Sequence, residues 1–243
     1  MLPVLLDVTR LSPGLSVLDV ATGPGFAAAA AAGHGAKAVG IDVAEAMIEQ
    51  ARAAHPEIDF RVGAAEDIPL EDDSVDVVLS SFGLPHFADH DAAFGEFRRV
   101  LRPGGRLAMS TWAPPDRNPF MDLAFGGVIA CGDPAAGSLP PGESPFAYAD
   151  PDRCVRDLGR AGFDDVTVFD VALTFSIGGA DGIMEFLADV GSRSKALFEA
   201  QSDEVRTDIR AFIAERIAPF EGADAVHRVP AVAVVVAATA STV

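Results

Sequence analysis

Two aspartates stand where a carboxylate could bind a ligand at the end of a strand. The stretch VLDVATGPG covers residues 17–25, and Asp19 interrupts its apolar run directly before a turn of small residues. A second apolar run, VGID, ends at Asp42. A carboxylate accepts hydrogen bonds from hydroxyl groups and attracts positive charge. The alternative for Asp19 is a strand that simply ends in an acidic turn.

The turn after the first run would let a ligand approach the backbone closely. Gly23 and Gly25 lie in it, and an Ala-rich helix is predicted to follow. Glycine has no Cβ, and the first N–H groups of a helix have no partner inside the helix. The spacing Gly23-x-Gly25-x-x-Ala28, with Asp42 downstream, also satisfies the dinucleotide fingerprint. The turn therefore indicates a nucleoside ligand without choosing its class.

Asp19 favours a ligand that carries no phosphate. A carboxylate directly before the turn would repel a pyrophosphate, whereas it would attract an ammonium group. S-adenosylmethionine has such a group at its methionyl end and no phosphate. Asp42 could then accept both ribose hydroxyls. The two acids together predict S-adenosylmethionine as the cofactor.

The order of apolar runs and helical patterns predicts an α/β fold with a doubly wound parallel sheet. The predicted strands cover residues 16–20, 38–42, 59–63, 75–80, 106–111, 166–175 and 232–238. The predicted helices cover residues 26–33, 44–54, 89–101, 120–130, 151–161 and 180–217, the last with an interruption near Gly191. In LRPGG, Pro103 is expected to end a helix before a tight turn. Parallel strands place their carboxyl ends, and a ligand, at one edge of the sheet.

Four segments in a fixed order carry a family resemblance. They are VLDVATGPG, VGIDVAEAM, VGAAEDIPLEDDSVDVVLSSFGL and FRRVLRPGGRLAMSTW. Together they resemble class I S-adenosylmethionine-dependent methyltransferases of the type 11 family, similar to ubiquinone/menaquinone-biosynthesis C-methyltransferases. The resemblance implies a Rossmann-like, seven-stranded sheet with an antiparallel last strand and helical cap insertions. We expect one domain over residues 1–243, with a cofactor-binding core at 1–112 and acceptor-binding caps at 113–150 and 176–228.

The resemblance also implies roles for individual residues. Those that would contact the cofactor are Asp19, Ala21, Gly23 and Gly25 near the methionyl and ribose groups, Asp42 at the ribose, Val43, Ala64, Ala65 and Glu66 near the adenine, and Ser81 beside the methyl donor. Two positions depart from the family. Ala21 stands where glycine is frequent, and Ala64 stands where many relatives have Asp or Asn. Asp67 could replace the adenine contact or point to solvent.

Methyl transfer needs alignment and, for some acceptors, a base. His86 follows the fourth predicted strand and could be that base, or a hydrogen-bonded loop histidine. Trp112, Asn118 and Tyr148 could contact the acceptor, or serve packing and loop hydrogen bonds. His90, among acidic neighbours, could bind a metal, but a solvated helix start explains it better, so we expect no metal.

Composition limits the partners. The chain has 243 residues and a net charge of −18, which disfavours nucleic acid and anionic membranes. Two cysteines without metal-type spacing and no secretory signal indicate a cytoplasmic protein. Only residues 1–14 precede the first strand, so the later helices or a partner subunit would supply the cap, or the cofactor site is unusually open. A homodimer is one expected arrangement. We expect transfer of a methyl group to carbon or oxygen of a small, apolar or aromatic metabolite. The rivals are a non-catalytic binding protein of the same fold and a nicotinamide-dependent oxidoreductase.

Overall fold

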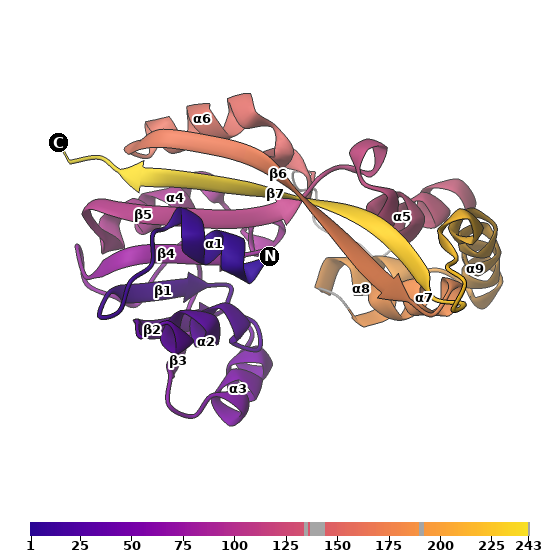
Figure 1. Ribbon diagram of the computed structural model, residues 1–243, viewed down its shortest axis with the longest axis horizontal. Helices are drawn as coiled ribbons and strands as arrows, with labels where there is room; N and C mark the ends of the chain where they lie inside the picture. The colour runs from indigo at the N-terminus through magenta and orange to yellow at the C-terminus, as the bar shows by residue number, and fades with distance from the viewer. Residues whose placement is uncertain (134–135, 137–143, 190–191, 243) are drawn as a thin grey trace. The chain divides into compact units, whose positions relative to one another are not determined.

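A seven-stranded sheet organises the chain in the computed structural model, which describes residues 1–133, 136, 144–189 and 192–242 (Figure 1). The predicted interruption near Gly191 lies outside these residues. The strands are β1 Ser16–Val20, β2 Lys37–Asp42, β3 Asp59–Val62, β4 Val75–Ser81, β5 Leu101–Trp112, β6 Phe163–Ile177 and β7 His227–Ala240. The helices are α1 Leu2–Val8, α2 Phe26–Gly33, α3 Glu45–Ala54, α4 His90–Val100, α5 Pro119–Cys131, α6 Pro151–Arg160, α7 Ala180–Asp189, α8 Ser192–Glu199 and α9 Asp203–Ile217.

The strand order is β3-β2-β1-β4-β5-β7-β6. β1 pairs in parallel with β2 and β4, β2 with β3, and β4 with β5, whereas β7 runs against β5 (Figure 1). The predicted fold class is therefore confirmed. The chain changes direction across the sheet between β1 and β4, and such a switch point leaves a crevice at the carboxyl ends of these strands. Asp19 is the fourth of the five residues of β1, close to this edge.

The central strands alternate their side chains between two helical layers. Val17 and Leu79 belong to an apolar cluster with α1 and α2, which includes Leu5. Their strand neighbours Leu18 and Val78 belong to a second cluster with α4 and α6. This alternation follows from the two-residue period of a strand. Because both faces are covered, these strands are almost continuously apolar, and Asp19 stands out among them.

The chain divides into two compact units. Unit 1 contains residues 1–111, 144–171 and 234–243, and unit 2 contains residues 112–143 and 172–233. Unit 1 thus holds the first four strands whole, and unit 2 holds α5 and α7 to α9. The expected single domain with two cap insertions stays a prediction.

The LRPGG segment differs from its prediction. Helix α4 ends at Val100, and Leu101 is already extended and pairs with Val75 as the first residue of β5. The register then shifts, since the next pair joins Val77 to Arg106, so residues 102–105 form an irregular bulge inside the strand. The helix therefore ends before Pro103, which disfavours a helical conformation for the residue preceding it.

Gly127 lets α5 approach α9 closely within unit 2. A Cβ added to Gly127 would lie 3.0 Å from Ile209 Cγ2 and 3.4 Å from Phe212 Cδ1, and one added to Gly126 would lie 3.5 Å from the Phe212 ring. Ile209 is fully buried. The close packing of these helices therefore depends on the missing side chain at Gly127.

We expect Gly127→Val to lower the free energy of unfolding by about 1–3 kcal/mol, because the added methyl groups overpack the contact with α9. The matched control is Gly95→Val in α4, where an added Cβ meets nothing within 4 Å. That control should stay within about 0.5 kcal/mol of the wild type, since valine is no worse than glycine in a helix. Urea unfolding of the three proteins measures the difference, and equal stabilities for the two variants would contradict the packing.

Candidate functional site

Asp19 is buried beneath the glycine turn at the tip of β1. Its Oδ2 accepts a hydrogen bond from Thr22 Oγ1 at 2.6 Å and one from the Ala28 N–H at 3.0 Å. Ala28 is the third residue of α2, so the carboxylate binds one of the N–H groups that the helix leaves unpaired. Among the described residues, Oδ1 is buried without a hydrogen-bond partner. Asp19 therefore stabilises the turn through Oδ2, and its Oδ1 remains available to a ligand.

Burial also changes the acidity of Asp19. Desolvation is the main cause that raises the pKa of this carboxyl from 3.8 to about 7. The bonds from Thr22 and Ala28 act in the opposite direction, and the negative charge of Asp42 adds to the rise. A positively charged ligand nearby would favour the ionised form.

The turn adopts conformations that favour glycine. Ala21, Gly23 and Gly25 have φ angles of 54°, 53° and 89°. A Cβ on Gly23 would meet nothing within 4 Å, so the turn is open there, whereas one on Gly25 would lie 2.7 Å from Phe60 Cζ. Ala21 thus occupies left-handed backbone at the position where relatives often have glycine. Ala21 and the two glycines form one continuous turn around that opening.

Asp42 joins the tip of β2 to the turn. Its Oδ2 accepts a hydrogen bond from the Gly23 N–H at 2.9 Å, and its Oδ1 accepts one from the Ala44 N–H at 2.9 Å. Each carboxylate oxygen can accept further bonds. Val43, the next residue, leaves 68% of its surface exposed, which is unusual for a valine in this unit. The tip of β2 thus presents an acid beside an apolar surface.

The loop after β3 holds three of the predicted cofactor residues. The Asp67 N–H donates to the Ala64 carbonyl at 3.3 Å, and Ala65 is buried in the core. Glu66 Oε1 accepts bonds from the N–H groups of Ala88 and Asp89, at 2.7 and 3.1 Å. The described contacts of the Glu66 carboxylate are therefore with the segment before α4, and Asp67 is exposed.

The residues after β4 form a short turn at the switch point. Ser81 is the last residue of β4 and pairs with Ser110 of β5. A Cβ on Gly83 would clash with Ser80 Oγ and lie 2.9 Å from Ala21 Cβ, so this turn packs against the glycine turn. His86 ends the 3₁₀ turn Leu84–His86 and is exposed. The structure thus brings the turn after β4 to the tip of β1, and the catalytic role of His86 stays a prediction.

Two of the predicted acceptor residues belong to unit 2. Trp112 packs against Phe175, with ring centroids 6.0 Å apart, and Phe175 packs against Phe120 at 4.4 Å. Asn118 is buried, donates through Nδ2 to the Val232 carbonyl at 2.8 Å, and caps α5 by accepting from the Met121 N–H. Its amide thus braces unit 2. The contacts of Trp112 and Asn118 with an acceptor stay predictions.

Tyr148, the third predicted acceptor residue, lies in the core of unit 1. Its hydroxyl donates to Asp157 Oδ2 at 3.2 Å, and its ring lies 4.6 Å from the ring of His90. Burial raises the pKa of the Tyr148 hydroxyl. His90 Nε2 lies 2.9 Å from the Leu84 carbonyl oxygen. Tyr148 and His90 thus form an internal contact, and the acceptor contact of Tyr148 stays a prediction.

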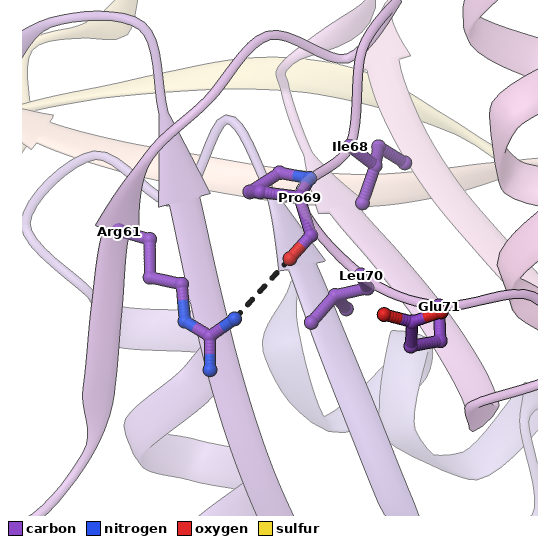
Figure 2. Close-up of a pocket in the computed structure, with 5 residues that line it drawn as sticks. All are labelled: Arg61, Ile68, Pro69, Leu70 and Glu71. Atoms are coloured by element: carbon purple, nitrogen blue, oxygen red, sulfur yellow. Dashed lines mark hydrogen bonds between the residues drawn. The ribbon is translucent and has the colours of Figure 1, made fainter.

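A pocket of ≈ 370 Å³ lies elsewhere on unit 1 (Figure 2). It is lined by Arg61, Ile68, Pro69, Leu70 and Glu71, and none of these is a predicted site residue. The Arg61 side chain crosses it to donate to the Pro69 carbonyl at 3.2 Å. Within the described ranges, no group of three or more His, Cys, Asp or Glu side chains could hold a metal ion. No helix in the same ranges is long and apolar enough to cross a membrane.

The strand tips fit S-adenosylmethionine by two observations. The buried, unpaired Asp19 Oδ1 suits a cationic group, and the open space at Gly23 suits close approach to the backbone. The residues that sequence reasoning missed are Thr22, which donates to Asp19, and Gly83, which packs against Ala21. A hydroxyl three residues after an aspartate is a usable signal for the first. The contact of Gly83 with Ala21 joins two loops that are 62 residues apart in the sequence, so no local pattern predicts it.

A parallel sheet in the order 3-2-1-4-5-7-6 with an antiparallel seventh strand defines the class I methyltransferase fold that the resemblance implied. Residues 18–109 match the model of the methyltransferase domain family. Residues 18–109 of the chain therefore carry a methyltransferase domain. The resemblance carried by the four motifs is confirmed.

Individual relatives share only part of their length with the chain. A demethylmenaquinone methyltransferase of Renibacterium salmoninarum is 35% identical over 117 residues, which cover 48% of this chain and 49% of that protein. The chain thus spans about half the length of this relative. The YcgJ protein of Bacillus subtilis superimposes with a TM-score of 0.60 at 19% identity and covers 99% of this chain and 97% of its own. The [4+2]-cyclase SpnF gives 0.59 at 18% identity, covering 100% and 80%. These two structures support the fold alone.

The raised pKa of Asp19 predicts an unusual dependence of stability on pH. The folded protein holds a proton on this carboxyl up to pH about 7, whereas the unfolded chain releases it near 3.8. The contribution of Asp19 is therefore complete below that lower value and is lost as pH rises through 7. Between pH 5 and 7 it should lower the free energy of unfolding by up to about 1.4 kcal/mol per pH unit.

The Asp19→Asn variant keeps the shape of the side chain and removes its titration. Urea unfolding of both proteins at pH 5, 6, 7 and 8 isolates the effect, because every other titrating group is shared. We expect the wild type to lose stability relative to the variant over this range. Parallel stability profiles for the two proteins would show that Asp19 is ionised throughout.

Proposed function

We propose that this chain transfers a methyl group from S-adenosylmethionine to carbon or oxygen of a small acceptor. The observation that carries the proposal is the 2.9 Å hydrogen bond from the Gly23 N–H to Asp42 Oδ2. In a dinucleotide site this part of the turn faces a pyrophosphate. Here the Gly23 N–H already donates to the Asp42 carboxylate, and the Asp19 carboxylate lies beneath the turn. Two acids beside one turn repel phosphate and suit a nucleoside that carries positive charge.

The roles proposed for the strand tips follow from their chemistry. Asp42 would accept the ribose hydroxyls with the lone pairs that Gly23 and Ala44 leave free, and Val43 would pack against the adenine. Asp19 would neutralise the methionyl ammonium group, and Ala21, Gly25, Ala64, Ala65 and Ser81 would line the remaining surface. When bound, S-adenosylmethionine supplies a methyl group on a sulfonium that is displaced in line. The chain itself needs only to align the acceptor and remove its proton.

His86 is the proposed base for an acceptor that must lose a proton. It is exposed on the turn that packs against the glycine turn through Gly83, so an acceptor placed at the switch point would be near it. Imidazole is suited to this task near neutral pH. The proposal for a small, apolar or aromatic acceptor draws support from the demethylmenaquinone methyltransferase relative. The match covers about half of that protein's length. We also propose a cytoplasmic protein without a nucleic-acid partner, and a homodimer as one arrangement.

A second candidate is a protein of this fold that binds the nucleoside without transferring methyl. SpnF, which has a similar fold, is a [4+2]-cyclase, so this fold also occurs in a protein named for another reaction. Calorimetry with S-adenosylmethionine and S-adenosylhomocysteine tests binding, and a methyl-release assay across a panel of phenols, quinols and enols tests transfer. Binding without turnover on that panel would favour the second candidate. Stabilisation by NAD in place of S-adenosylmethionine would refute both.

Asp42→Ala should weaken S-adenosylhomocysteine binding by about 10- to 100-fold, because it removes charge-assisted hydrogen bonds to the ribose. Isothermal titration calorimetry measures the dissociation constant. Glu45→Ala, three residues further along on the exposed first turn of α3, is the matched control and should bind as the wild type does. An unchanged constant for Asp42→Ala would refute the ribose assignment.

His86→Ala should lower kcat by about 100-fold or more, as loss of a general base does, while the dissociation constant for S-adenosylhomocysteine changes little. The measurement uses an acceptor that the panel identifies. His34→Ala replaces an exposed histidine at the end of α2 and serves as the control. Full activity of the His86 variant would leave His86 as an ordinary loop histidine.

A further inference from the structure

Glu66 connects two loops that are far apart in the sequence. Its Oε1 accepts a hydrogen bond from the Ala88 N–H at 2.7 Å and a second from the Asp89 N–H at 3.1 Å. Both donors belong to the segment that leads into α4, where Asp89 is the N-cap residue. Bonds from N–H groups to a carboxylate are about twice as strong as those between neutral groups. One side chain therefore fixes two consecutive peptide groups.

These peptide groups end the post-β4 turn, which we define as residues 82–89. The start of the same turn is also fixed, because the Phe82 N–H donates to two atoms of Ser110, the carbonyl oxygen and Oγ, each at 3.1 Å. His86 lies between these two attachments. Phe82 has a φ of 59°, a conformation that surrounding contacts must maintain. The position of His86 thus depends on Ser110 at one end and Glu66 at the other.

Glu66 is itself held firmly at its own end. Ala65 is buried in the core of unit 1, and the Asp67 N–H donates to the Ala64 carbonyl across a tight turn. A displacement of residues 64–67 would therefore move the Glu66 carboxylate rather than be absorbed by a slack loop. The loop proposed to face the adenine and the turn proposed to carry the base share one connection.

We infer that Glu66 is a positioning residue that transmits cofactor binding from the 64–67 loop to the post-β4 turn. The inference rests on the proposed function, since it requires a nucleoside at residues 64–67. It changes the role expected for Glu66, whose carboxylate acts on the protein backbone and not on the adenine. Cofactor binding then orders the His86 turn before the acceptor arrives.

Amide hydrogen exchange by NMR tests the inference on the whole chain, with S-adenosylhomocysteine as the probe. In the wild type, saturating probe should slow exchange at Ala88 and Asp89 by about tenfold or more, because ligand binding stabilises the local closed state. In Glu66→Ala this slowing should fall below about twofold, with a dissociation constant that calorimetry finds unchanged. Glu66→Gln, which keeps an acceptor oxygen, should restore part of the slowing. Glu71→Ala, at an exposed carboxylate of the same segment, should behave as the wild type.

The two proposals fail in different ways. Absence of S-adenosylhomocysteine binding by the wild type would overturn the proposed function and the inference together. Binding by the wild type without any slowing at Ala88 and Asp89 would overturn the inference alone. So would ligand-dependent slowing that persists in both Glu66 variants. A rise in the dissociation constant together with loss of the slowing in Glu66→Ala would return Glu66 to direct contact with the cofactor.

Discussion

The bond between the Gly23 N–H and the Asp42 carboxylate is the interaction on which the site depends. It joins the turn after β1 to the tip of β2, and it uses the N–H group that a phosphate-binding turn would offer to its ligand. The second oxygen of Asp42 holds the Ala44 N–H at the entry to α3. The two oxygens of Asp42 thus determine both the shape of the turn and the charge of the ligand that the turn favours.

The topology explains why this bond falls where it does. Strand order reverses between β1 and β4, so the turns after these strands meet without a crossover helix between them. Gly83 allows that meeting, because any side chain there would collide with Ser80 and Ala21. Left-handed backbone at Ala21 carries a cost for a residue with a Cβ, and the packing of the two turns maintains it.

Local patterns were sufficient for most elements and insufficient for long-range contacts. The apolar runs of β1 to β4 and the spacing of Gly23, Gly25 and Asp42 gave the sheet and the turn, because each depends on a few adjacent residues. Helix α1 was missed, since its seven residues are too few for a helical period. The partners of Glu66 lie 22 and 23 residues away, and the Val232 carbonyl bound by Asn118 lies 114 residues away. No local pattern encodes such pairings.

The two acids of the site differ in what the fold itself gains from them. Asp42 keeps contact with solvent and forms two hydrogen bonds, so its charge costs the folded chain little. Asp19 is only 1% exposed and has an unpaired oxygen, so desolvation disfavours its charged form and raises its pKa to about 7. A neutral residue could cap α2 and accept from Thr22 at a lower cost. Stability alone therefore does not account for an acid at this position. The proposed cationic ligand would account for it, because its charge would favour the ionised form of Asp19 and offset the desolvation, so Asp19 indicates ligand charge more specifically than the glycine turn above it.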